Sequence, residues 1–221
     1  MQIIWHGQSC FEIIAAKGKG EHVTILIDPL NEEVTGIKNP KTDASIVLLT
    51  NHKYTAASDN LKKIAPDAFI VDGPGEYEIK GVYIQGTAGA QISAEGKDPA
   101  GTNTIYAIEA EEMKLCHLGN LQDAELPADV VERIGNIDIL MAPVGNAKNI
   151  GAKETMKVVS QIEPSIIVPM NYEIPKLKLD ANNLQEFLKE AGIGSVEPLP
   201  KLTIKRKDVS AEEAKIIVLN P

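Results

Sequence analysis

Short apolar runs, separated by glycine, proline and polar residues, recur along the chain and predict a strand-rich protein. Four segments with apolar residues at helical spacing interrupt this pattern: one from Ser58 or Asp59 to Ala65, then 127–134, 152–162 and 180–191. The predicted strands are 1–5, 10–15, 23–27, 46–50, 68–71, 76–79, 82–84, 104–109, 113–118, 137–141, 165–169, 201–206 and 214–219.

Capping residues and polar or glycine-rich segments mark the ends of several predicted elements. Asp180 is the predicted N-cap of the last helix, and Gly192 is its predicted stop. The polar segment 31–44 is expected to form a surface loop, and the glycine-rich segment 86–103 a mobile loop.

The order of the elements predicts an α/β sandwich rather than a simple doubly wound sheet. Strands dominate first, then alternate with helices, and return at the end. No composition break marks a linker, so we expect one domain over 1–221. Loops follow strand ends at 28, 50, 72, 119, 143 and 170, and in such folds these loops tend to converge on one edge.

Charge and composition narrow the class of protein. The net charge of −9 argues against nonspecific nucleic-acid binding and against binding to acidic membranes. No apolar run approaches the length of a membrane span, and we expect a cytoplasmic protein. The two cysteines, Cys10 and Cys116, are too few for a disulfide framework and are expected to be buried, reduced thiols.

Six segments follow one another along the chain at the ends of the predicted strands. They are Ile4-Trp5-His6-Gly7-Gln8-Ser9-Cys10-Phe11, Ile25-Leu26-Ile27-Asp28-Pro29, Val47-Leu48-Leu49-Thr50, Gly73-Pro74-Gly75-Glu76-Tyr77-Glu78, His117-Leu118-Gly119-Asn120 and Val168-Pro169-Met170-Asn171-Tyr172. In this order they resemble the metallo-β-lactamase fold, and in particular its branch of small stand-alone zinc-dependent hydrolases. The resemblance spans nearly the whole chain and implies a four-layer αββα sandwich.

The same resemblance locates a metal site, and most of its ligands are replaced. The family loop His-x-His-x-Asp-His falls on Asn51, Lys53, Thr55 and Ala56. Other substitutions follow the same trend: Gln8 stands for the histidine of Gly-His-Ser, Asn120 for the bridging aspartate and Asn171 for the last histidine. Two family residues remain: His117 matches a ligand, and Asp28 falls just behind the metal site.

These replacements predict that the metal site is dismantled. A catalytic zinc takes about three protein ligands from imidazole, thiolate and carboxylate, and only His117 qualifies. Amides are weak, uncharged ligands, and the Lys53 ammonium would repel a divalent cation. A more specific hypothesis pairs Lys53 with Asp28 in place of the metal charge. Without a metal, hydrolysis of the family type loses its activated water.

Three functional hypotheses remain open. In the first, the protein is noncatalytic and uses the old cleft or a self-association surface to bind a small molecule or protein, with no metal cofactor and with homo-oligomers plausible by family analogy. In the second, a hydrolase of phosphoesters, amides or lactones uses a rearranged site around His117, with zinc or another divalent metal or with none; Asp28, His52 and Asn171 would then converge. In the third, the chain is a purely structural subunit.

His117 is expected to be a hydrogen-bonded, uncharged histidine rather than a catalytic base. Cys116 points to the opposite face of the same strand and cannot form a dyad with it. A Cys10–His117 dyad stays geometrically open. Glu76 and Glu78 share one strand face in an ordinary half-buried pattern, so paired acid–base carboxylates are the weaker interpretation.

Overall fold

The computed structural model describes residues 1–18, 20–51, 55–56, 58–89, 103–145, 150–209 and 214–221. Its helices are α1 Glu32–Thr35, α2 Ser58–Ile64, α3 Ala128–Ile134, α4 Ala152–Ile162, α5 Leu184–Glu190 and a 3-10 turn at Arg206–Asp208. Its strands are β1 Gln2–Trp5, β2 Phe11–Gly18, β3 Glu21–Ile27, β4 Ile46–Leu48, β5 Phe69–Val71, β6 Gly75–Ile79, β7 Val82–Ala88, β8 Thr104–Ala110, β9 Met113–His117, β10 Ile139–Pro143, β11 Ile166–Met170, β12 Leu202–Thr203 and β13 Lys215–Ile216.

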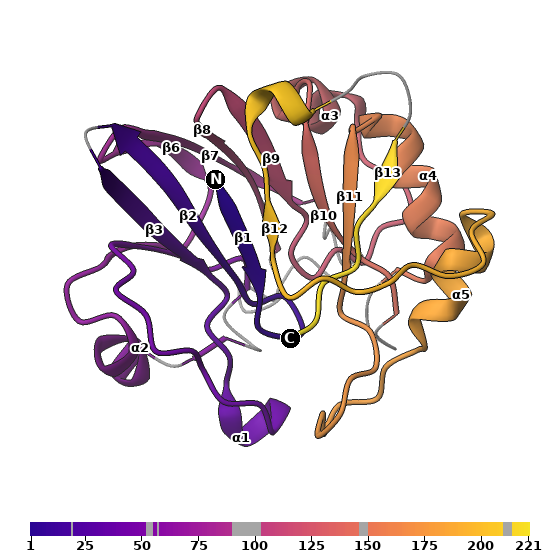
Figure 1. The fold of residues 1–221 in the computed structure, drawn as a ribbon, viewed down its shortest axis with the longest axis horizontal. Coiled ribbons are helices and arrows are strands. Elements are labelled where there is room, and N and C mark those ends of the chain that lie inside the picture. Colours follow the sequence, from indigo (N-terminus) through magenta and orange to yellow (C-terminus); the bar gives the residue numbers. More distant parts are fainter. Residues whose placement is uncertain (19, 52–54, 57, 90–102, 146–149, 210–213) are drawn as a thin grey trace, which may run out of the picture.

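The described strands form two sheets that face each other, with helices on the outside of each (Figure 1). The six-stranded sheet has the order β12-β1-β2-β3-β4-β5, and the seven-stranded sheet has the order β13-β11-β10-β9-β8-β7-β6. The predicted αββα sandwich is therefore confirmed.

Alternation along β3 and β4 separates two cores, because successive side chains of a strand point to opposite faces. Ile46 and Leu48 pack in the core between the sheets, whereas Val47 packs in a second core on the outer face. Helix α2 covers that outer face, and its Leu61 belongs to the same core as Val47. The first sheet is thus buried on both faces where β4 runs through it.

The second sheet carries α3, α4 and α5 on its outer side (Figure 1). Val158 and Ile162 of α4 and Phe187 of α5 pack in the main core. Strands β9, β10, β11 and β13 pair in parallel, and every residue of β10 and β11 is buried. Burial on both faces is what parallel strands under helices require. No helix in the described ranges is long and apolar enough to cross a membrane.

Three expectations about boundaries were wrong. Segment 31–44 contains the short helix α1, which Asn31 caps. Helix α5 is capped by Asn183 rather than by Asp180, because backbone bonds of Asn182 to Glu173 and Gly145 hold the chain in place just before the helix begins. The terminal strands are shorter than predicted, since the chain leaves β12 for the turn at Arg206–Asp208.

The glycine-rich segment 86–103 also departs from the prediction at both ends. Strand β7 continues to Ala88, and the side chain of Asn103 is fully buried rather than part of a mobile loop. Residues 90–102 lie outside the described residues.

Candidate functional site

The predicted site residues follow strands that end at one edge of the sandwich. In the first sheet Trp5 pairs with Phe11, which pairs with Ile27, and Ile27 pairs with Leu48, so the segments after β1, β3 and β4 leave from the same edge. The two sheets meet there, because the Thr104 amide donates to the Thr50 carbonyl at 2.8 Å. We call the following set the strand-end site: Gln8, Asp28, Asn51, His117, Asn120 and Asn171.

Asp28 is held by Thr50, the second residue after the end of β4. Its side chain is 1% exposed, and its two carboxylate oxygens accept hydrogen bonds from the Thr50 backbone amide at 2.7 Å and from the Thr50 hydroxyl at 2.5 Å. Thr50 is thus a site residue that the sequence interpretation missed. The predicted Lys53–Asp28 pair falls on Lys53, which lies outside the described residues.

Both ring nitrogens of the buried His117 bond to backbone atoms. Nε2 lies 3.0 Å from the Ser9 carbonyl oxygen and Nδ1 accepts from the Gly119 amide at 3.1 Å. Because a carbonyl oxygen only accepts, Nε2 carries the hydrogen and the imidazole is neutral. Burial lowers the pKa of His117 to about 4, although the Ser9 carbonyl raises it in part. The hydrogen-bonded, uncharged histidine that the sequence predicts is confirmed.

The Cys10–His117 dyad is not formed. Cys10 packs in the outer core with Leu26 and Val47, whereas His117 directs its two ring nitrogens to Ser9 and Gly119. Burial raises the pKa of the Cys10 thiol well above its usual value, and the charge of Asp28 adds to this effect. A thiol that stays protonated is a poor nucleophile. Both cysteines are buried and free, as predicted.

Asn103 is the second site residue that the sequence interpretation missed. Its side-chain nitrogen donates to the Leu118 carbonyl at 2.8 Å, and its side-chain oxygen accepts from the Asn120 amide at 2.8 Å. Gly119 lies against it with φ +62°, where a Cβ would overlap the Asn103 side-chain oxygen and approach Thr50 Oγ1 to 2.8 Å. The loop after β9 therefore fits only with glycine at this position.

Asn120, Asn171 and Gln8 come together, as the resemblance implies for the residues that replace three metal-site positions. The Asn171 side-chain nitrogen donates to the Asn120 side-chain oxygen at 3.1 Å. The Asn171 backbone amide approaches the Gln8 carbonyl oxygen at 3.4 Å. All three side chains are at least nine-tenths buried. This part of the site is held by neutral amides.

Asn51 and Thr55 lie on the loop after β4. The Thr55 hydroxyl donates to the Asn51 carbonyl at 2.7 Å, and Thr55 forms an isolated bridge with Leu30. Both residues are buried. His52, which the hydrolase hypothesis would recruit, lies outside the described residues.

Left-handed backbone occurs at three residues of the strand-end site. The φ angles are +49° at Gln8, +46° at Asp28 and +59° at Asn171. Residues with a Cβ adopt this conformation at a cost of about 1–2 kcal/mol, less for asparagine and aspartate than for glutamine. The backbone at the site is therefore strained where glycine would relieve it.

The described donors do not fit a divalent transition metal. The His117 nitrogens are engaged by backbone, and the other side chains are amides apart from Asp28, whose two oxygens bind Thr50. Within the described ranges, no group of three or more histidine, cysteine, aspartate or glutamate side chains could hold a metal ion. A catalytic zinc needs about three such ligands with unengaged lone pairs.

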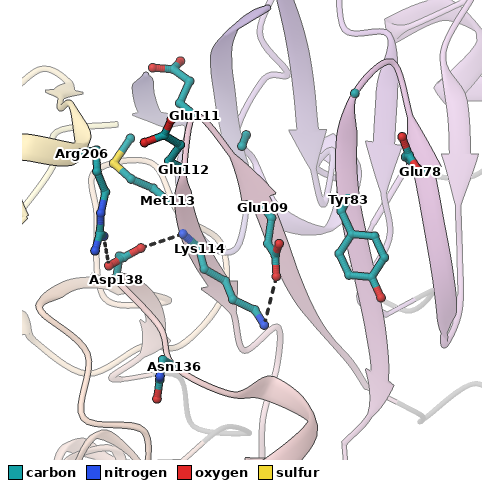
Figure 2. A pocket seen from close by; sticks show the side chains of 12 residues that line it. Glu78, Tyr83, Glu109, Glu111, Glu112, Met113, Lys114, Asn136, Asp138 and Arg206 are labelled. Carbon is teal, nitrogen blue, oxygen red and sulfur yellow. Dashed lines mark hydrogen bonds and ion pairs between the residues drawn. The ribbon is translucent and has the colours of Figure 1, made fainter.

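A separate cavity of about 510 Å³ lies at the other end of β9 (Figure 2). Four of its charged groups form two ion pairs: Lys114 Nζ lies 3.3 Å from a Glu109 oxygen, and an Arg206 guanidinium nitrogen lies 2.5 Å from an Asp138 oxygen. The second Asp138 oxygen accepts from the Lys114 backbone amide at 2.8 Å. These contacts stabilise the turns around β9, and the strand-end site remains the candidate functional site.

Comparisons with known proteins identify the family to which this fold belongs. A family model described as "Beta-lactamase superfamily domain" matches residues 2–171. The chain is 27% identical over 213 residues to a "UPF0173 metal-dependent hydrolase" of Thermococcus onnurineus, covering 84% of this chain and 90% of that protein. It is 26% identical over 226 residues to a protein of the same designation from Methanopyrus kandleri, covering 87% and 94%.

A solved structure gives a similar result. A protein of Thermotoga maritima, assigned as a Zn-dependent hydrolase of the metallo-β-lactamase superfamily, superposes with a TM-score of 0.73 at 29% identity. The match covers 99% of this chain and 97% of that one. The fold is thus shared over nearly the full length of both chains.

Proposed function

Because the chain belongs to the β-lactamase superfamily, we propose that it is a member whose metal site is replaced by a site of hydrogen-bonded amides, and that it binds a ligand or partner without hydrolysing it. The hydrogen bond between the side chains of Asn171 and Asn120 carries this proposal. Two side chains at positions that the resemblance assigns to metal ligands are neutral and bond to each other.

The remaining residues support a noncatalytic role. A metallohydrolase depends on a metal to generate hydroxide at neutral pH. His117 cannot take that role as a base in this arrangement, because its Nε2 hydrogen faces the Ser9 carbonyl and its Nδ1 lone pair accepts from Gly119. General-base catalysis requires a lone pair within reach of the proton to be removed.

The backbone strain favours a binding role over a purely structural one. Gln8, Asp28 and Asn171 hold left-handed conformations in three separate loops of the same site. Such strain is costly and in proteins concentrates at functional sites, where the surrounding structure holds it in place. A site without a role would gain stability by exchanging Gln8 for glycine.

A screen for hydrolysis tests the proposal. Phosphoester, carboxylic ester, amide and lactone substrates are assayed with the purified protein, with and without added Zn²⁺, Mn²⁺ or Fe²⁺. We expect no turnover above the protein-free rate. The control is His22→Gln, which replaces an exposed histidine. Metal-dependent turnover that is lost in His117→Gln but kept in His22→Gln would contradict the proposal.

A further inference from the structure

Two buried polar atoms of the strand-end site have no hydrogen-bond partner among the described residues: Gln8 Nε2, a donor, and Asn171 Oδ1, an acceptor. The side chain of Gln8 belongs to a residue 5% exposed, and that of Asn171 to one 1% exposed. Buried polar groups are nearly always paired, because burial without a partner forfeits their hydration. Each of these atoms therefore calls for a bound group.

The positions of both residues are fixed by other bonds. The Gln8 carbonyl accepts from Trp5 Nε1 at 2.7 Å and faces the Asn171 backbone amide at 3.4 Å. The Asn171 side-chain nitrogen is engaged by Asn120, which leaves Oδ1 as the open atom. The donor Gln8 Nε2 and the acceptor Asn171 Oδ1 do not bond to each other, so one ligand that reaches both atoms would satisfy both.

The described side chains around these two atoms favour a neutral group. His117 is uncharged, and Asp28 directs both carboxylate oxygens to Thr50. An anion would be buried here without a described cation to balance it, and a metal ion would lack ligands. A neutral group that offers an acceptor to Gln8 and a donor to Asn171 matches the pair, and a carboxamide carries both on one edge.

We propose that the strand-end site binds small neutral molecules through a primary carboxamide group. The ligand carbonyl accepts from Gln8 Nε2, and the ligand N–H donates to Asn171 Oδ1. This assignment rests on the proposed noncatalytic function and names its ligand class. Specificity follows from the unpaired atoms, because a ligand lacking the donor or the acceptor leaves one of them buried and unsatisfied.

Three probes of similar size test the assignment: acetamide, acetate and N,N-dimethylacetamide, which lacks the N–H donor. Side-chain amide signals in ¹⁵N–¹H NMR spectra are followed during titration, with those of Gln8 identified by their loss in Gln8→Met. We expect acetamide to shift the Gln8 signals saturably, with a dissociation constant on the order of millimolar for so small a ligand. Acetate and N,N-dimethylacetamide are expected to cause no saturable shift.

Gln8→Met keeps the length of the side chain and removes the donor, so acetamide binding should weaken about tenfold or more. The melting temperature of the free variant should hold or rise, because a buried unpaired donor is lost. Gln85→Met, on the half-buried strand β7, is the matched control and should bind acetamide as the wild type does.

Equal binding of acetate, absence of any saturable shift, or a crystal soaked in acetamide with only water between Gln8 and Asn171 would overturn the ligand assignment. These outcomes are distinct from failure of the proposed function, which is signalled by hydrolysis or bound metal. If the protein is metal-free and inactive but does not bind acetamide, only the carboxamide proposal is refuted.

Discussion

The side-chain nitrogen of Asn171 donates a hydrogen bond to the side-chain oxygen of Asn120 across 3.1 Å. This bond joins the loop after β11 to the loop after β9. Asn120 is held in turn by Asn103 through its backbone amide, and the Asn171 backbone amide approaches the Gln8 carbonyl. Two positions that the resemblance assigns to metal ligands are thus joined by a hydrogen bond between neutral groups.

Gly119→Ala should destabilise the protein by about 3 kcal/mol or more. The residue has φ +62°, and a Cβ would overlap the Asn103 side chain and press against Thr50. The free energy of unfolding in urea measures the effect. Gly192→Ala is the matched control, because Gly192 has φ +75° but no atom within 4 Å of the added Cβ, and its cost should be only about 1 kcal/mol. Equal costs would contradict the crowding around Gly119.

Thr50→Val should lower the free energy of unfolding by about 1–3 kcal/mol, because the hydroxyl that donates to Asp28 is replaced by a methyl group of similar size. Thr50→Ser keeps the hydroxyl and should cost less than Thr50→Val. Urea unfolding of the two variants separates the hydrogen bond from the packing. If Val is tolerated as well as Ser, the Asp28–Thr50 bond contributes little.

His117 should make stability depend on pH in the acidic range. The folded-state pKa is about 4, against an ordinary value of 6.5, so the unfolded chain binds more protons between these two values. The His117 contribution is fully present above pH 6.5, falls by about 3 kcal/mol as the pH is lowered to 4, and changes no further below. Unfolding measured from pH 4 to 7 gives this slope.

His117→Gln should flatten the slope relative to the wild type, whereas the exposed His22→Gln should leave it unchanged. NMR of the ring nitrogens provides an independent readout, and the neutral form with hydrogen on Nε2 should persist to below pH 5. A titration midpoint near 6.5 would show that His117 is not held as described.

The two cysteines should resist thiol reagents in the native protein. Both are buried, and burial raises the pKa of Cys116 to about 12 and that of Cys10 well above its usual value. The thiolate is the reactive form, so Ellman's reagent at pH 8 should react slowly with the native chain and rapidly with both thiols in guanidinium. Fast reaction of one thiol without denaturant would contradict its burial.

The order of the elements predicted an α/β sandwich, and the resemblance implied its four layers. The alternation along the strands agrees with the two faces that the structure shows. Ile46 and Leu48 belong to one core and Val47 to another, as period-two alternation requires. The predicted boundaries were wrong where tertiary contacts determine the end of an element. Asn183 rather than Asp180 caps α5, because backbone hydrogen bonds of the neighbouring Asn182 hold the chain in place just before the helix. The side chains of Asn183 and Asp180 are both suitable N-caps, so the local sequence does not distinguish them.

The site was predictable from the resemblance at most of its positions, but two of its central residues were not. Thr50 was read as the end of a strand, and Asn103 as part of a mobile loop. An asparagine directly before a strand was the available signal for Asn103, yet only the fold shows that it spans Leu118 and Asn120. Hydrogen bonds between residues distant in sequence cannot be read from local pattern.

The metal content of protein purified without chelators, measured by mass spectrometry of the elements, tests the central claim most directly. The positive control is a variant with the family ligands restored: Asn51→His, Lys53→His, Thr55→Asp, Ala56→His, Asn120→Asp and Asn171→His. The amide site predicts that the wild-type chain carries far less than one ion of zinc, manganese or iron. Near-stoichiometric metal in the wild type would contradict it.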